Sequence, residues 1–115
     1  MNRHTLNTDL NLLHANVCQA LADPKRILIL YALAERPRHV TNLAQDLNLP
    51  QPTVSRHLRI LHQQSLVETE REGISITYRL IDNRVIEVLD TLRLLVFESL
   101  ERQTAVVNYA THHTY

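Results

Sequence analysis

The stretch VTNLAQDLNLPQPTVSRHLRILHQQSL, residues 40–66, decides the fold of this chain. Its apolar residues recur at spacings of three and four on both sides of a short break, which is typical of two helices joined by a tight turn. Thr41 is expected to cap the first helix. In the second helix, Val54, Leu58 and Leu61 stand at i, i+4 and i+7 and predict its buried side. The stretch therefore predicts a helix-turn-helix.

The opposite side of the second helix is the expected contact surface for duplex DNA. A major groove admits one α-helix, and residues near the start of a recognition helix reach the base edges. Arg56 has the paired donors that match a guanine edge, hydroxyl groups can contact a base or a phosphate, and Arg59 is expected to contact phosphate. His57 is expected either to pack or to flank the DNA. The expected DNA contacts on this helix are Gln51, Thr53, Ser55, Arg56, His57 and Arg59.

Beyond residue 66 the apolar residues alternate with polar ones, which indicates two strands. The alternation breaks at Gly73, which suits a tight turn because glycine adopts positive φ without steric penalty. We expect a β-hairpin whose Arg71 and Arg79 contact phosphates or a minor groove, with Glu68, Glu70 and Glu72 as acidic neighbours. The residues expected to share one face of the hairpin are Ile74, Ile76, Tyr78 and Leu80.

Helices are predicted on both sides of this central region. An apolar stripe predicts a first helix at about 9–21, and Asp23 followed by Pro24 marks the start of a second. A long apolar helix is expected from about Asn83 to Arg102. The predicted fold is mainly α with a small β-hairpin, in the order α-α-α-α-β-β-α. We expect one domain over residues 1–115, with residues 1–8 and 104–115 as flexible tails.

Composition excludes several classes of protein. Lys and Arg number 12 and so do Asp and Glu, so any DNA binding has to come from local clustering of charge. The single cysteine, Cys18, rules out a disulfide framework within one chain, and no apolar run suggests a signal peptide or a membrane span. We therefore expect a cytoplasmic protein without membrane contact. No nucleophile–base pair or phosphate-binding glycine loop is visible, so an enzyme is not expected.

Three elements in order resemble the ArsR/SmtB family. They are ALADPKR at residues 20–26, VSRHL at residues 54–58 and the short REG turn at residues 71–73, and the resemblance covers about residues 16–100. It implies a homodimeric winged helix-turn-helix repressor that binds an imperfect inverted repeat and is released by an inducer. It also implies a dimer interface formed by the first and last helices. The expected interface residues are Leu10, Leu13, Val17, Leu92, Val96 and Leu100.

The family's usual metal-ligand patterns are missing from this chain. The positions that carry ligands on the last helix of its metal sensors are here Asp82, Arg84, Leu95 and Glu98, which lack both imidazoles. The cysteine pair of the arsenic sensors is replaced at residues 39–41 by His-Val-Thr. No cofactor is therefore predicted, and a metal inducer is not supported by these patterns.

Other inducers stay open. Cys18 is a candidate for thiol sensing, although the second helix has Tyr31 where the family's sulfur sensors carry a cysteine. His112 and His113 stand next to each other in the C-terminal tail, where they could take part in metal sensing. The alternative function is a winged-helix module that binds a protein, or binds DNA without reading its sequence.

Overall fold

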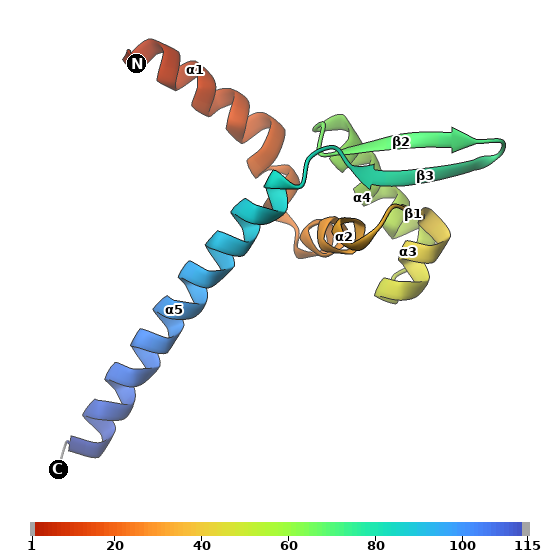
Figure 1. The fold of residues 1–115 in the computed structure, drawn as a ribbon. Helices are drawn as coiled ribbons and strands as arrows, with labels where there is room; N and C mark the ends of the chain where they lie inside the picture. Colours follow the sequence, from red (N-terminus) through yellow and green to blue (C-terminus); the bar gives the residue numbers. More distant parts are fainter. Residues whose placement is uncertain (1, 114–115) are drawn as a thin grey trace. The chain divides into compact units, whose positions relative to one another are not determined.

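The computed structural model describes residues 2–113, and it describes side chains for residues 2–105. The chain divides into two compact units, residues 1–83 and residues 84–115. The second unit contains one helix, α5, Arg84–His113. The elements of the first unit (Figure 1) are α1 Arg3–Leu13, η1 His14–Cys18, η2 Ala20–Ala22, α2 Pro24–Glu35, β1 Arg38–His39, α3 Val40–Leu47, α4 Gln51–Gln63, β2 Val67–Glu72 and β3 Ser75–Leu80.

Helices α3 and α4 form the predicted helix-turn-helix. Asn48 ends α3 in the left-handed conformation at φ 54°, and the Leu49 amide then donates to the Ala44 carbonyl at 3.0 Å. An asparagine is one of the few residues that tolerates this conformation at a helix end. The predicted buried side of α4 is confirmed, because its three residues are all fully buried: Val54, Leu58 and Leu61.

The start of α3 differs from the prediction. Helix α3 begins at Val40, directly after the two-residue strand β1, so Thr41 lies inside the helix and does not cap it. His39 stands at the N-cap position without a side-chain cap bond, and its Nδ1 lies 3.1 Å from the Ile76 carbonyl oxygen. Strand β1 pairs with β3 and makes the sheet three-stranded in the order β1-β3-β2. Two residues are too few to show an alternating pattern, so the sequence gives no signal for β1.

Strands β2 and β3 form the predicted hairpin, which we call the wing. They pair from Val67 opposite Leu80 to Glu72 opposite Ser75, and the wing tip extends past α3 and α4 (Figure 1). Gly73 has φ +64°, as expected for a tight turn. Ile74 does not share the strand face as predicted, because it lies in the turn and is fully exposed.

Local capping sets the helix starts in the N-terminal part. Helix α1 begins at Arg3 and not near Asp9, because the Asn2 side chain accepts the Thr5 amide proton at 2.8 Å. The helix then passes through a π-helical turn, η1, and a 3-10 turn, η2. The predicted start of α2 is confirmed, since Asp23 accepts from the Lys25 amide at 2.8 Å and Pro24 stands in the first turn.

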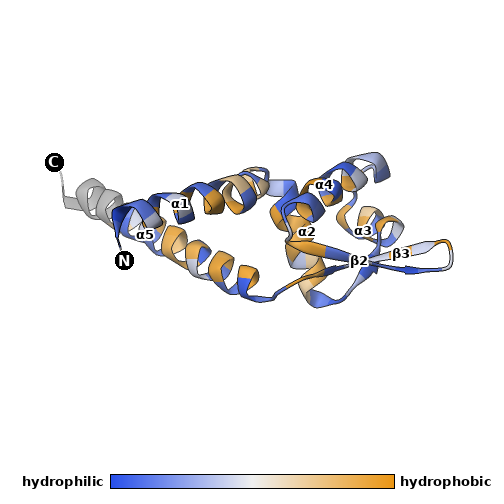
Figure 2. Ribbon diagram, turned by 90° about the horizontal axis from the view of Figure 1, so that it is seen from above, coloured by the Kyte–Doolittle hydropathy of each residue, from blue (hydrophilic) through white to orange (hydrophobic). Residues whose placement is uncertain are grey.

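Helix α5 extends to His113 and not to Arg102 as predicted. Residues 103–113 contain neither proline nor glycine, so nothing in the sequence ends the helix earlier. Apolar residues recur along both α5 and α1 (Figure 2), and most of them are exposed. A helix that exposes a stripe of large apolar side chains lacks the surface that would cover it.

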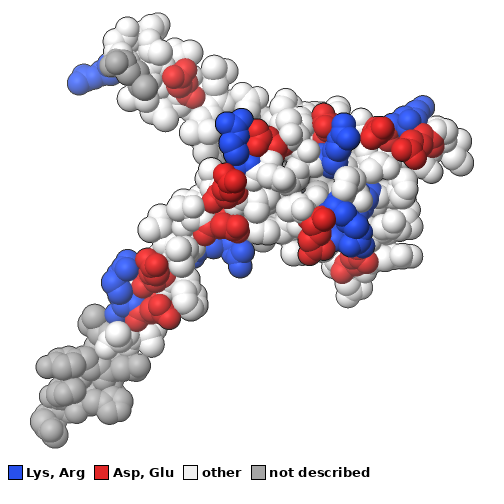
Figure 3. All heavy atoms as spheres, viewed as in Figure 1, with Lys and Arg blue, Asp and Glu red and all other residues white. Residues whose placement is uncertain are grey.

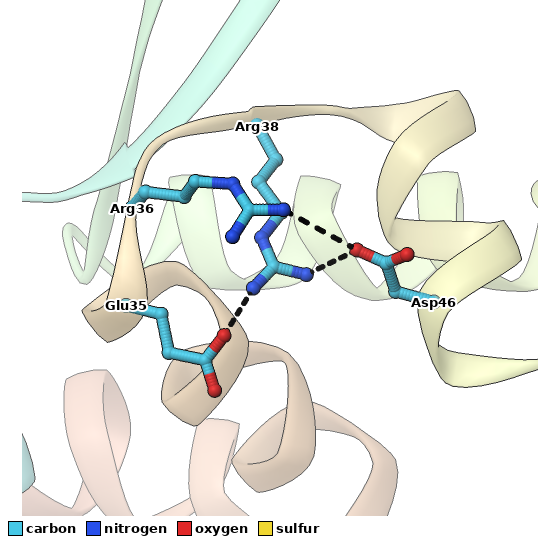
Figure 4. A network of polar contacts seen from close by, with 4 residues as sticks. All are labelled: Glu35, Arg36, Arg38 and Asp46. Carbon is cyan, nitrogen blue, oxygen red and sulfur yellow. Dashed lines mark hydrogen bonds and ion pairs between the residues drawn. The ribbon is translucent and has the colours of Figure 1, made fainter.

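A buried arginine joins the end of α2 to α3. Arg38 is 6% exposed, and its guanidinium donates to Glu35 at the end of α2 and to Asp46 on α3, each at 2.5 Å (Figure 4). Arg36 also lies near Asp46, at 3.9 Å. A buried guanidinium depends on its carboxylate partners, because removing one leaves a charge without compensation. The cluster therefore holds α3 against the rest of the unit.

We expect Asp46→Ala to lower the free energy of unfolding by about 1–2 kcal/mol, because Arg38 loses a charged acceptor that is itself half exposed. Urea unfolding followed by circular dichroism measures the change. Gln45→Ala is the matched control, since Gln45 is the exposed neighbour on the same helix. Equal stability of the two variants would show that the Arg38 cluster does not hold α3.

Candidate nucleic-acid interface

The outward side of α4 carries most of the predicted DNA contacts. Gln51, Arg56 and Arg59 are exposed, and Thr53 and Ser55 are half-buried. Helix α4 contains no carboxylate, and no ion pair within the described side chains involves either of its arginines. The arrangement is a helix side with two available guanidinium groups, two hydroxyls and one amide, opposite a fully buried apolar side.

His57 is not on this outward side. It is 3% exposed, and its Nδ1 lies 3.2 Å from a terminal nitrogen of Arg26 on α2. A guanidinium can only donate, so Nδ1 accepts and the ring proton is on Nε2. Nε2 lies 3.9 Å from the Asp23 carboxylate and has no hydrogen-bond partner among the described residues. The prediction that His57 contacts DNA does not fit this position, and we leave it out of the interface.

Two neighbouring groups have shifted pKa values. Burial lowers the pKa of His57, the nearby Arg26 guanidinium lowers it further, and Asp23 opposes the shift. The pKa of Asp23 is lowered mainly because its carboxylate accepts the Lys25 amide proton. His57 is therefore neutral at pH 7, in agreement with the donor and acceptor roles above.

The two arginines of the wing lie on opposite faces of the hairpin. Arg79 stands opposite Glu68 and donates to it at 2.7 Å, and it also lies 3.5 Å from Glu70. Arg71 stands opposite Ile76 on the other face and is exposed. Basic and acidic side chains stand together on the wing in the view of Figure 3.

Arg26 is a residue that the sequence analysis missed. Its Nε donates to the Ala20 carbonyl at 2.6 Å and its second terminal nitrogen donates to the Gln19 carbonyl at 3.1 Å. A signal was present, because a cation in the first turn of a helix is opposed by the helix dipole and needs another role. Arg38 gave no such signal, since it follows Pro37 in a stretch for which the sequence predicts no helix or strand.

The predicted dimer residues are mostly exposed in the single chain. Leu10 and Leu13 on α1 are about half exposed, as are Leu92, Val96 and Leu100 on α5, whereas Val17 is half-buried. This exposure leaves large apolar side chains available on two helices. It is the condition that an interface between copies requires.

The candidate sensing residues are not brought together. Cys18 is exposed on η1. Within the described residues, no group of three or more His, Cys, Asp or Glu side chains could hold a metal ion. The side chains of His112 and His113 lie outside the described ones. None of the described helices has the length and apolarity needed to cross a membrane.

Comparison with known proteins agrees with this geometry. The model of the family "Bacterial regulatory protein, arsR family" matches residues 23–69, from the cap of α2 to the start of the wing. The biofilm growth-associated repressor of Xylella fastidiosa is 32% identical over 89 residues, which cover 77% of each chain. This chain belongs to the arsR family. Members of this family are transcriptional regulators and not enzymes.

Two further relatives bear on the arsR assignment. The HTH-type transcriptional regulator NmtR of Mycobacterium tuberculosis is 43% identical over 76 residues, which are 66% of this chain and 63% of NmtR. The chain thus spans less than two thirds of that relative. The homodimeric winged helix-turn-helix DNA-binding domain of Mb0332 from Mycobacterium bovis superposes with a TM-score of 0.73 at 29% identity, covering 89% of this chain and 93% of that one. The fold of this arsR-family chain is a winged helix-turn-helix.

We expect the stability of the fold to decrease as the pH falls from 7.5 to 5.5. An unfolded histidine takes up a proton near pH 6.5, whereas folded His57 resists it because its pKa is lowered. Each pH unit over which the folded chain binds one proton fewer costs about 1.4 kcal/mol. The contribution of Asp23 is lost only below about pH 5, because its pKa also shifts downward.

The measurement is urea unfolding at about pH 7.5, 6.5 and 5.5 for the wild-type chain and for His57→Gln. The glutamine oxygen can still accept from Arg26 but does not titrate. The variant should lose less stability over this range than the wild-type chain. An equal loss in both proteins would mean that His57 is not the responsible group.

Proposed function

We propose that this chain is a sequence-specific DNA-binding transcriptional repressor that acts as a homodimer. The observation that carries the proposal is the composition of α4. The apolar residues on its inner side are fully buried, and its outward side offers hydrogen-bond donors and contains no carboxylate. These side chains suit duplex DNA, because the base edges in the major groove and the phosphates beside it carry mainly hydrogen-bond acceptors. The matched family is one of bacterial regulators, whose DNA lies in the cytoplasm, so we place this chain there.

In this proposal the residues of α4 have different tasks. Arg56 pairs with the two acceptors of a guanine, and Thr53 and Ser55 contact a base or a phosphate from the first turns of the helix. Arg59, about one turn beyond Arg56, contacts phosphate and sets the position of the helix on the duplex. Gln51 is close to the helix start, where base edges are within reach.

The two arginines of the wing are expected to contribute unequally to DNA binding. Arg71 is exposed on a face without glutamates, so we propose that it contacts a phosphate or a narrow minor groove. Arg79 is held by Glu68 and Glu70, and a DNA contact would have to break at least one of these ion pairs. We therefore expect Arg79 to contribute less than Arg71.

The exposed apolar residues of α1 and α5 support dimerisation through these helices. A stable interface buries on the order of 1,600 Å² in total, and a symmetric pair uses the same residues twice. The Mb0332 domain, similar in fold, is homodimeric. Two-fold symmetry would place two α4 helices about 34 Å apart, one turn of DNA, so the expected operator is an imperfect inverted repeat.

We propose that an inducer lowers the DNA affinity of this dimer. Cys18 is exposed, so a thiol-reactive compound is one candidate class of inducer. A metal ion is the second candidate class, although no group of ligands for one is found among the described side chains. A small organic molecule is the third class. Measuring release from the operator with a panel of oxidants, sulfur species, metals and small molecules identifies the class.

Selection of DNA from a random pool tests the function. A repressor should enrich an inverted repeat and bind it about 10³-fold or more tightly than random duplex at the same salt concentration. A module that binds DNA without reading its sequence would show almost no preference. A protein-binding module would show no affinity for duplex DNA at all.

We expect Arg56→Ala to weaken binding to the selected operator by about 1–3 kcal/mol and to relax the preference at one base pair. Arg59→Ala is the matched comparison, because losing a phosphate contact weakens binding to all duplexes alike. Fluorescence anisotropy with the operator and with single-base variants measures both. If the preference of Arg56→Ala is unchanged, Arg56 does not read a base.

We expect Leu92→Asp combined with Val96→Asp to raise the dimer dissociation constant about a hundredfold or more, because each interface would bury four unpaired carboxylates. Sedimentation velocity over a concentration series measures it, with circular dichroism confirming that the helices remain. Glu101→Ala on the other side of α5 is the control. An unchanged dimer would place the interface elsewhere.

A further inference from the structure

The connection between α1 and α2 contains two irregular turns, and we call residues 14–22 the arm segment. In its π-helical part, the Gln19 amide donates to the His14 carbonyl five residues earlier, at 3.3 Å. A 3-10 turn follows at residues 20–22. Carbonyl groups at the end of a helix need donors from outside it. In this segment those donors include two side chains of other elements.

The first donor comes from the end of the recognition helix. Gln64 follows the last residue of α4, and its side-chain carboxamide lies against two carbonyls of the arm segment. We place the amide nitrogen toward them, because an oxygen in that place would face only acceptors. In this orientation it donates to Ala15 at 2.9 Å and to Asn16 at 3.2 Å. The C-terminal end of α4 is therefore bonded directly to the arm segment.

The second donor reaches the same segment from α2. Arg26 donates to the carbonyls of Gln19 and Ala20, and its remaining terminal nitrogen bonds to His57 on α4. His57 and Gln64 are seven residues apart, which is two helical turns, so they lie on the same side of α4. His57 is 3% exposed, so its contact with Arg26 is shielded from water. Helix α4 is thus connected to the arm segment at two points, through Arg26 at His57 and directly by Gln64 at its C-terminal end.

We propose that Gln64 and Arg26 are positioning residues that couple DNA binding by α4 to the conformation of the arm segment. This inference rests on the proposed function. A rearrangement of the π-helical turn would break bonds that hold α4 in place and would lower its affinity for DNA. Coupling between two sites is reciprocal, so DNA bound to α4 also stabilises the arm segment. The segment directly follows α1, so a change in the α1 environment reaches α4 by this route.

Amide hydrogen exchange of residues 14–22, measured by mass spectrometry on the chain of 115 residues, tests the coupling. Gln64→Ala removes the donor, and Gln63→Ala is the matched control because Gln63 is exposed on the last turn of α4. Without DNA, the amides of this segment should exchange about fivefold faster in Gln64→Ala than in the wild-type chain and in Gln63→Ala. Gln64→Glu should exchange as fast as the alanine variant, because a carboxylate has the same size but cannot donate.

The decisive comparison adds the selected operator. In the wild-type chain and in Gln63→Ala, operator should slow exchange in residues 14–22 by about tenfold, a typical strength of coupling between sites. In Gln64→Ala this protection should be clearly smaller, while slower exchange in the wing, residues 67–80, shows that operator is bound in every sample. Unchanged exchange in free Gln64→Ala, or equal operator protection in all three proteins, would overturn the proposal. If the wild-type chain binds no selected duplex, the proposed function has failed, which is seen before any variant is compared.

Discussion

Burial of one side of α4 is the constraint on which the rest of the structure depends. Val54, Leu58 and Leu61 are fully buried, and each contributes roughly 1.5–3 kcal/mol relative to an exposed side chain. Turning α4 about its axis would expose all three at once. The outward side, with its hydroxyl, amide and guanidinium groups, is therefore fixed by apolar packing on the opposite side. Packing fixes the rotation of α4 about its axis, and the polar contacts of His57 and Gln64 fix its position along that axis.

The parts of the fold that follow a strong period could be predicted from the sequence. The spacing of Val54, Leu58 and Leu61 placed the recognition helix, and alternation around Gly73 placed the wing, because one buried side produces a repeat in the sequence. Strand β1 has only two residues and produces no repeat. The end of α5 could not be placed because no helix-breaking residue marks it.

The site was predictable in outline and less so residue by residue. The 100° step of a helix correctly separated Arg56 and Arg59 from the buried side, but it does not tell whether a histidine at the boundary faces inward. His57 faces inward because Arg26 on another helix supplies a donor for it. The opposite faces of Arg71 and Arg79 follow from the strand register, and the ion pairs of Arg79 follow from pairing across the hairpin. The spacing of residues within one segment does not predict its contacts with distant segments.

A nuclear magnetic resonance titration of the isotope-labelled chain with the selected operator duplex tests most directly which side chains meet DNA. If the outward side of α4 binds DNA, the largest shift changes will fall on the amides of Thr53, Ser55, Arg56 and Arg59, with a smaller group at Arg71. Large changes confined to the exposed residues of α1 or α3, with α4 undisturbed, would contradict it.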